Sequence, residues 1–131
     1  MRTLILLAAI PALMGAASPP AETLQGEWRN TLNTVHLSVK PCGDALCGSV
    51  TWASDEQRAA AKRGSGQDIV GRVLLRDLRR NDNGTWRGKA FIPAINSSAS
   101  ATVTQLNNNL MRVTGCTLMG LACKTQHWHR I

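Results

Sequence analysis

The sequence contains no tyrosine, one phenylalanine and only eight acidic residues, and these shortages argue against several kinds of catalysis. Paired carboxylates for acid–base chemistry would have to come from those few acids, yet Asp55 and Glu56 begin a helix, and Asp44 and Asp82 lie in turn segments. Nucleophilic catalysis needs a Ser, Cys or Thr beside a base, and no Gly-x-Ser-x-Gly motif occurs. We therefore predict a protein that is not an enzyme and holds no cofactor.

Long apolar runs are also missing, apart from one at the N-terminus. There a short positive start precedes the apolar segment Leu4–Met14, and small residues at Gly15–Ala17 suit a signal peptidase. No other stretch reaches the length of a membrane-spanning helix, so we expect a periplasmic or secreted protein without a membrane span, cleaved near Ala17. The predicted organisation is a signal peptide at 1–17, a linker at 18–24 and a single domain at 25–131.

Four cysteines in a small exported domain indicate two disulfides rather than a metal site. Three pairings are possible, and closeness in the sequence favours Cys42 with Cys47 and Cys116 with Cys123. A zinc site built from the same residues is the alternative. The spacing departs from Cys-x-x-Cys, however, and an oxidising compartment competes for the thiols.

His127 and His129 are weak candidates for metal ligands. They are two residues apart, hence on one face of a strand, and His36 is a possible third ligand for copper or zinc. No carboxylate or cysteine lies at a matching spacing, so a solvated outer face is the simpler interpretation. We predict no metal site.

The chain alternates short strand patterns with turn residues. Val35, Leu37 and Val39 alternate with polar residues, and Asn81–Gly84 is typical of a hairpin turn. A capping box at Ser54–Gln57 predicts one short helix that ends at Gly64–Gly66. We predict a mainly β fold, a small antiparallel up-and-down β-barrel of about eight strands with one short helix after the third. The predicted strands are Gly26–Arg29, Thr34–Lys40, Leu46–Trp52, Ile69–Leu78, Thr85–Ile92, Ala99–Leu106, Leu110–Cys116 and Cys123–Ile131.

Several motifs together resemble the DUF2147 family of exported bacterial proteins. They are Gly26-Glu27-Trp28, the paired-cysteine segments Pro41–Gly48 and Gly115–Cys123, and the terminal Gln126–Arg130. The resemblance implies a lipocalin-like barrel without an assigned biochemical function. The chain departs from the family pattern after Ile92, where a different segment replaces one that carries a tyrosine.

The four tryptophans supply most of the aromatic area. We regard Trp52, Trp86 and Trp128 as candidates for lining a ligand cavity, although packing in a filled core is the alternative. Lipocalin-like folds often place a tryptophan of the first strand under an arginine of the last. This implies a structural cation–π contact between Trp28 and Arg130, worth about 0.5–2 kcal/mol.

The net charge of +7 comes mainly from arginines spaced singly along the chain, so we expect no nucleic-acid binding. The function we expect is a non-catalytic binding module for one small, partly apolar ligand. The alternative is a protein-interaction or inhibitor module of the cell envelope, whose partner binds the basic surface or the helix-bearing segment Ser54–Gln67.

Overall fold

The computed structural model describes residues 24–117 and 122–131. The predicted signal peptide and residues 18–23 of the predicted linker lie outside this part of the chain. Leu24, which we also assigned to the linker, is 0 % exposed in the core. Its carbonyl oxygen accepts a hydrogen bond of 2.9 Å from Trp28 Nε1. The folded domain therefore includes Leu24, and the predicted boundary at residue 25 is corrected.

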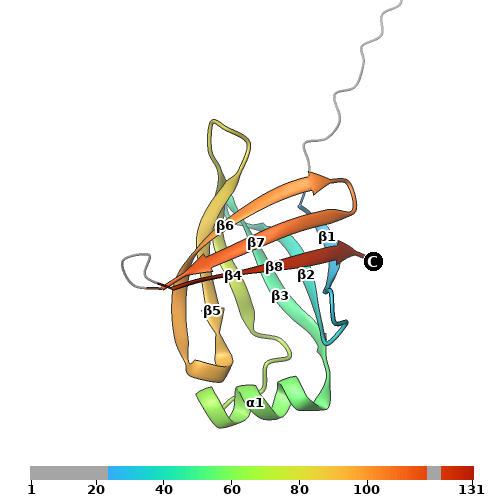
Figure 1. Ribbon diagram of the computed structural model, residues 1–131, viewed down its shortest axis with the longest axis vertical. Coiled ribbons are helices and arrows are strands. Elements are labelled where there is room, and N and C mark those ends of the chain that lie inside the picture. The colour runs from blue at the N-terminus through green and yellow to red at the C-terminus, as the bar shows by residue number, and fades with distance from the viewer. Residues whose placement is uncertain (1–23, 118–121) are drawn as a thin grey trace, which may run out of the picture.

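Eight antiparallel strands form a closed barrel, in which each strand pairs with its neighbours in the sequence and β1 pairs with β8 (Figure 1). This confirms the predicted up-and-down barrel with one helix after the third strand. The helical elements are α1 Asp55–Ser65 and the short 3-10 turn η1 Pro93–Ile95. The strands are β1 Gly26–Asn30, β2 Val35–Cys42, β3 Ala45–Ala53, β4 Val73–Arg80, β5 Trp86–Ile92, β6 Ser97–Asn107, β7 Leu110–Cys116 and β8 Cys123–Arg130.

The alternation in β2 shows how the sequence builds the core. Val35, Leu37 and Val39 are all buried, as their spacing of two predicts. The start of β4 differs from the prediction, because Ile69 lies in a loop and the strand begins at Val73. Gly71 adopts a φ of 90°, a left-handed conformation that turns the chain before the strand starts.

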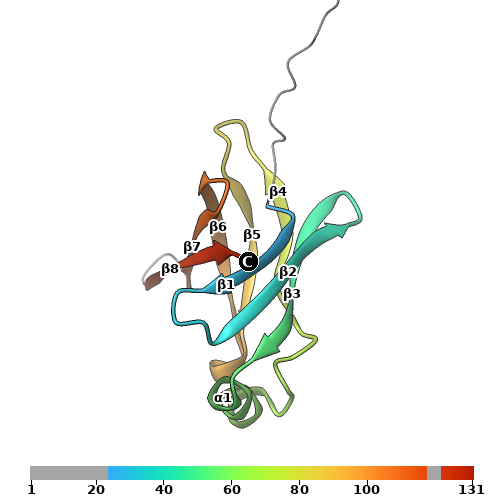
Figure 2. The same ribbon diagram turned by 90° about the vertical axis from the view of Figure 1, so that its right-hand side faces the viewer.

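Helix α1 lies across one end of the barrel (Figures 1 and 2). It begins where Ser54 accepts a hydrogen bond from the Gln57 backbone N–H at 3.3 Å, and it ends at Gly66 with a φ of 79°. Gly64 packs directly against the backbone carbonyls of η1, where a Cβ atom would find no room. The helix is therefore held on η1 by close backbone contact. No described helix is long and apolar enough to cross a membrane.

The up-and-down order divides the connections between two ends of the barrel. One end, which we call the closed end, carries the β2–β3, β4–β5 and β6–β7 turns. The other, which we call the helix end, carries the β1–β2 turn, α1, η1 and the paired ends of β7 and β8 at Cys116 and Cys123. The cavity described below lies at the helix end.

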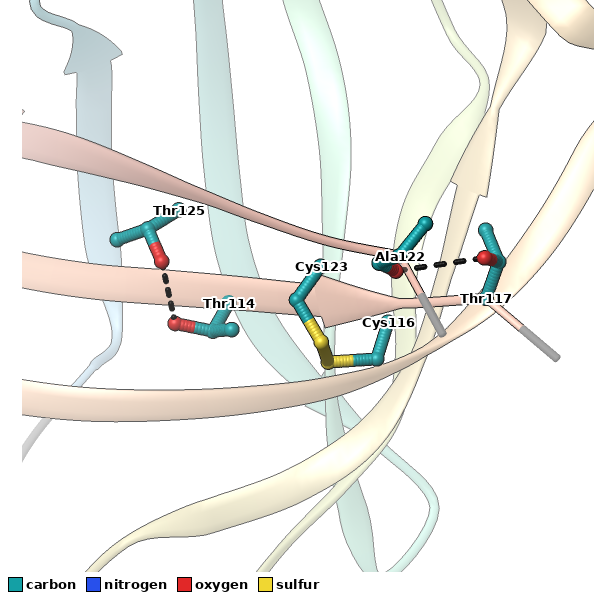
Figure 3. Close-up of a disulfide and its surroundings, with 6 residues drawn as sticks. All are labelled: Thr114, Cys116, Thr117, Ala122, Cys123 and Thr125. Carbon is teal, nitrogen blue, oxygen red and sulfur yellow. Dashed lines mark hydrogen bonds between the residues drawn. A yellow bond between two sulfur atoms is a disulfide. The ribbon is translucent and has the colours of Figure 1, made fainter. Parts of the chain in front are cut away.

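Each end of the barrel carries one disulfide, in the pairing that sequence proximity favours. Cys42 and Cys47 join β2 to β3 at the closed end, with 5.9 Å between their Cα atoms. Cys116 and Cys123 join β7 to β8 at the helix end, with a Cα–Cα distance of 4.1 Å (Figure 3). All four cysteines are thereby paired, and the zinc alternative is wrong because no thiolate remains to bind metal.

Candidate functional site

A cavity of about 590 Å³ lies inside the helix end of the barrel. Its wall includes Leu37 of β2, Leu75 of β4 and Phe91 of β5, and its lid is formed by α1 and η1. Ala60 and Ala61 face it from the helix. Because alanine side chains are small, the helix covers the end of the barrel without filling the space beneath it.

Strand β8 supplies the polar part of the wall. Lys124, Gln126 and Trp128 all line the cavity, as expected for residues that alternate on one face of a strand. Trp128 is only 5 % exposed, whereas Lys124 and Gln126 are exposed although they face inward. The cavity therefore reaches solvent beside these two side chains.

The opening follows from the lengths of the strands that close the barrel. β1 ends at Asn30, which pairs with Trp128, and only the last three residues of β8 pair with β1. The segment 123–127 continues past the end of β1 and pairs with β7 alone among the described strands. This difference in length leaves the side of the barrel next to Lys124 without a covering strand.

Of the three tryptophans predicted to line a cavity, only Trp128 is in the wall. Trp52 is 45 % exposed, and its ring lies against His36 with 4.7 Å between the ring centroids. The prediction is wrong for Trp52 because β3 contains a β-bulge: Leu37 pairs with Val50 and His36 pairs with Trp52, so the extra residue Thr51 turns the next side chain outward.

Trp86 is partly buried and packs against the core cluster. It is not among the described residues that line the cavity, so the prediction is wrong for this residue as well. Core packing, the alternative weighed from the sequence, describes Trp86 correctly.

Trp28 and Arg130 meet at the closed end. The guanidinium carbon of Arg130 lies 4.3 Å from the centre of the Trp28 ring, which is 0 % exposed. Arg130 Nε donates to the carbonyl oxygen of Asn108 at 2.6 Å, and its Nη1 donates to that of Gln25 at 2.7 Å. Because one side chain joins the chain before β1 to the β6–β7 turn, this contact is structural.

The structure does not gather the histidines into a metal site. His127 is exposed, and Nε2 of His129 lies 3.1 Å from the hydroxyl oxygen of Thr31. His36 Nε2 is 2.8 Å from Asn33 Oδ1. Within residues 24–117 and 122–131, no three His, Cys, Asp or Glu side chains are placed to share a metal ion.

One feature that the sequence did not reveal is a basic strip on the outer face of β4 and β5, formed by Arg76, Arg79, Arg87 and Lys89. Arg76 pairs with Lys89, and Arg79 pairs with Arg87, so like charges lie directly opposite each other. Asp44 forms an ion pair of 3.0 Å with Arg79, and this hydrogen bond lowers the pKa of Asp44. The strip depends on the strand register, which single arginines spaced along the chain do not specify.

A closed eight-stranded antiparallel barrel with an apolar cavity and a helix across one end defines a lipocalin-like protein. The fold is similar to that of protein HP1028 from the human pathogen Helicobacter pylori, described as belonging to the lipocalin family. The TM-score is 0.64 and the identity 18 %, with 83 % of each chain covered. At this identity the likeness shows the fold alone.

The family model of an uncharacterized protein conserved in bacteria, DUF2147, matches residues 26–130. The chain belongs to this family. No curated protein matches it.

Proposed function

We propose that the protein is a non-catalytic binding module that holds one small, partly apolar ligand in the cavity at the helix end. The observation that supports this most directly is the cavity volume of about 590 Å³. Sites for small molecules commonly measure about 300–1,000 Å³ and combine an apolar wall with a few polar groups. Here the apolar wall includes Leu37, Leu75 and Phe91, and the polar groups belong to Lys124 and Gln126.

The two disulfides support a location outside the cytoplasm. Disulfides form and persist in oxidising compartments such as the bacterial periplasm, and the apolar N-terminal segment is typical of an export signal. We therefore propose that the module acts in the periplasm or after secretion. A ligand carried there would be shielded from water by the barrel and by α1.

Titration with the neutral fluorophore N-phenylnaphthylamine tests the proposal. The wild type should bind one molecule with increased fluorescence. Ala90→Leu should weaken binding about tenfold, because a larger side chain in the wall takes up cavity space and overpacking costs roughly 1–3 kcal/mol. Ala59→Leu is the matched control, since Ala59 is exposed on α1 outside the cavity wall. Absence of saturable binding, or equal affinity in Ala90→Leu, would overturn the proposal.

The basic strip supports a second candidate function, a module that binds an acidic protein of the cell envelope. Opposed cations such as Arg76 and Lys89 destabilise a strand pair, and an anionic partner would relieve this repulsion. Under this proposal Arg76→Glu with Arg87→Glu abolishes periplasmic cross-linking to an acidic partner and leaves N-phenylnaphthylamine binding unchanged. Cross-links that survive the double charge reversal would exclude the strip as the contact.

A further inference from the structure

We propose that the ligand is an amphipathic anion, a single alkyl chain with a carboxylate head, whose head binds at Lys124 and whose chain enters the cavity. This inference rests on the proposed function, because it specifies the ligand of the same cavity. It is supported by the charge of the wall, by the order of side chains along β8 and by the cross-strand contacts that fix Lys124.

The charge of the cavity wall has one sign. Among the described residues that line the cavity, Lys124 is the sole charged side chain, and no Asp or Glu is present. Neither ion pair found in residues 24–117 and 122–131 involves Lys124. The neighbouring segment 118–121 contains only Leu, Met and Gly. Lys124 is therefore available to an anion, and the net charge of +7 favours the approach of one.

The side chains of β8 are arranged by polarity from the opening inward. Lys124 lies nearest the end of the strand, Gln126 follows, and Trp128 is buried deeper in the barrel. Lysine offers three donors and the glutamine amide two, all suited to carboxylate oxygens. The wall also includes the buried Leu37 and Leu75, which can contact only an apolar chain favourably. The polar head and apolar tail of one ligand would match this order.

The backbone that carries Lys124 is fixed on both sides. The Cys116–Cys123 disulfide precedes it, and the hydroxyl groups of Thr114 and Thr125 lie 3.0 Å apart immediately after it (Figure 3). The Thr117 N–H also donates to the Ala122 carbonyl oxygen at 2.8 Å. A site held in place before the ligand arrives loses less conformational entropy on binding. The ammonium group nevertheless remains exposed, so its contribution to affinity is modest and sensitive to salt.

Three ligands with the same chain and different heads test the head-group preference: dodecanoate, dodecanol and dodecylammonium. Displacement of N-phenylnaphthylamine gives the affinity of each. In low salt near neutral pH, the wild type should bind dodecanoate about fivefold more tightly than dodecanol, the range of an exposed ion pair. Dodecylammonium should bind more weakly than the alcohol. The preference for dodecanoate should shrink in high salt, whereas dodecanol binding should not weaken.

Variants at Lys124 assign the preference to one side chain. Lys124→Gln should bring the affinities for dodecanoate and dodecanol together, and Lys124→Glu should make dodecylammonium the better ligand. Lys89→Gln is the matched control, since it removes the same charge from the outer face of β5 and should keep the preference. Displacement by dodecanol with no preference for dodecanoate, or a preference that survives Lys124→Gln, would overturn this inference alone. Failure of all three ligands and of the fluorophore would overturn the proposed function with it.

Discussion

The closed end of the barrel holds the first and last strands together, whereas the helix end encloses a cavity. At the closed end, the buried Trp28 ring, the stacked Arg130 and the hydrogen bond from Arg130 to the Gln25 carbonyl join the first strand to the last, and a second hydrogen bond joins Arg130 to the β6–β7 turn. At the helix end, β8 runs past the end of β1 and an alanine-lined helix covers a cavity. The Trp28–Arg130 contacts thus lie at the end of the barrel away from the cavity. The helix end contains the cavity and the exposed side chains of Lys124 and Gln126.

The largest expected effect tests the closed end. Trp28→Ala should lower the free energy of unfolding by about 3–5 kcal/mol, because it removes a fully buried large side chain. Arg130→Ala should lower it by about 1–3 kcal/mol, since it removes the cation–π contact and leaves two carbonyl oxygens without this donor. Arg130→Lys should recover only part of the loss, because an ammonium lacks the planar guanidinium fork. Urea unfolding measures all three.

The double variant and a surface control sharpen this test. The double variant Trp28→Ala with Arg130→Ala should lose less unfolding free energy than the sum of the two single losses, as expected for residues in contact. Arg112→Ala, an exposed arginine on β7, should change stability by no more than about 0.5 kcal/mol. Strict additivity in the cycle would show that the stack does not couple β1 to β8.

The two disulfides should separate stability from binding. Cys42→Ser with Cys47→Ser, and Cys116→Ser with Cys123→Ser, should each cost about 2 kcal/mol, because both close short loops. Only the second pair of substitutions should also weaken dodecanoate binding, since that disulfide precedes Lys124. Urea melts and fluorophore displacement on both variants check this. An equal loss of dodecanoate affinity in the two variants would mean that the effect is general destabilisation.

Much of the barrel could be predicted because its signals are local. Alternation at Val35, Leu37 and Val39 and the cap at Ser54 depend on neighbouring residues only. The same period of two holds in β8, where Lys124, Gln126 and Trp128 all line the cavity.

The features that sequence reasoning missed depend on register and strand length. The bulge at Thr51, which turns Trp52 outward, is visible only once β3 is paired with β2. The exposure of Lys124 depends on where β1 ends relative to β8, because a longer first strand would have covered it. The basic strip likewise arises from the pairing of β4 with β5. In the sequence Lys124 simply follows Cys123, and this position indicates neither the strand register nor the strand lengths.

The smallest expected effect concerns an exposed ion pair at the helix end. Arg58 of α1 contacts Asp68 of the following loop through two nitrogens, with Nη2 2.5 Å from Oδ2. This hydrogen bond, together with one from the Val70 N–H, lowers the pKa of Asp68 to about 2. In the unfolded chain the pKa of an aspartate is about 3.9. The ionised carboxylate therefore stabilises the fold above that value, and its contribution is lost as the pH falls toward about 2.

Asp68→Asn should accordingly lower the urea midpoint near neutral pH by a small amount, because solvent screens an exposed pair. The difference from wild type should vanish in acid, where the wild-type carboxylate is also neutral. Asp82→Asn, in the exposed β4–β5 turn, is the matched control and should match the wild type throughout. A difference between Asp68→Asn and wild type that persists at the acid end would assign the effect to packing or to the amide group. The charge on Asp68 would then contribute nothing measurable to the attachment of α1, and the contact of Gly64 with η1 would be the principal contact that holds the helix over the cavity.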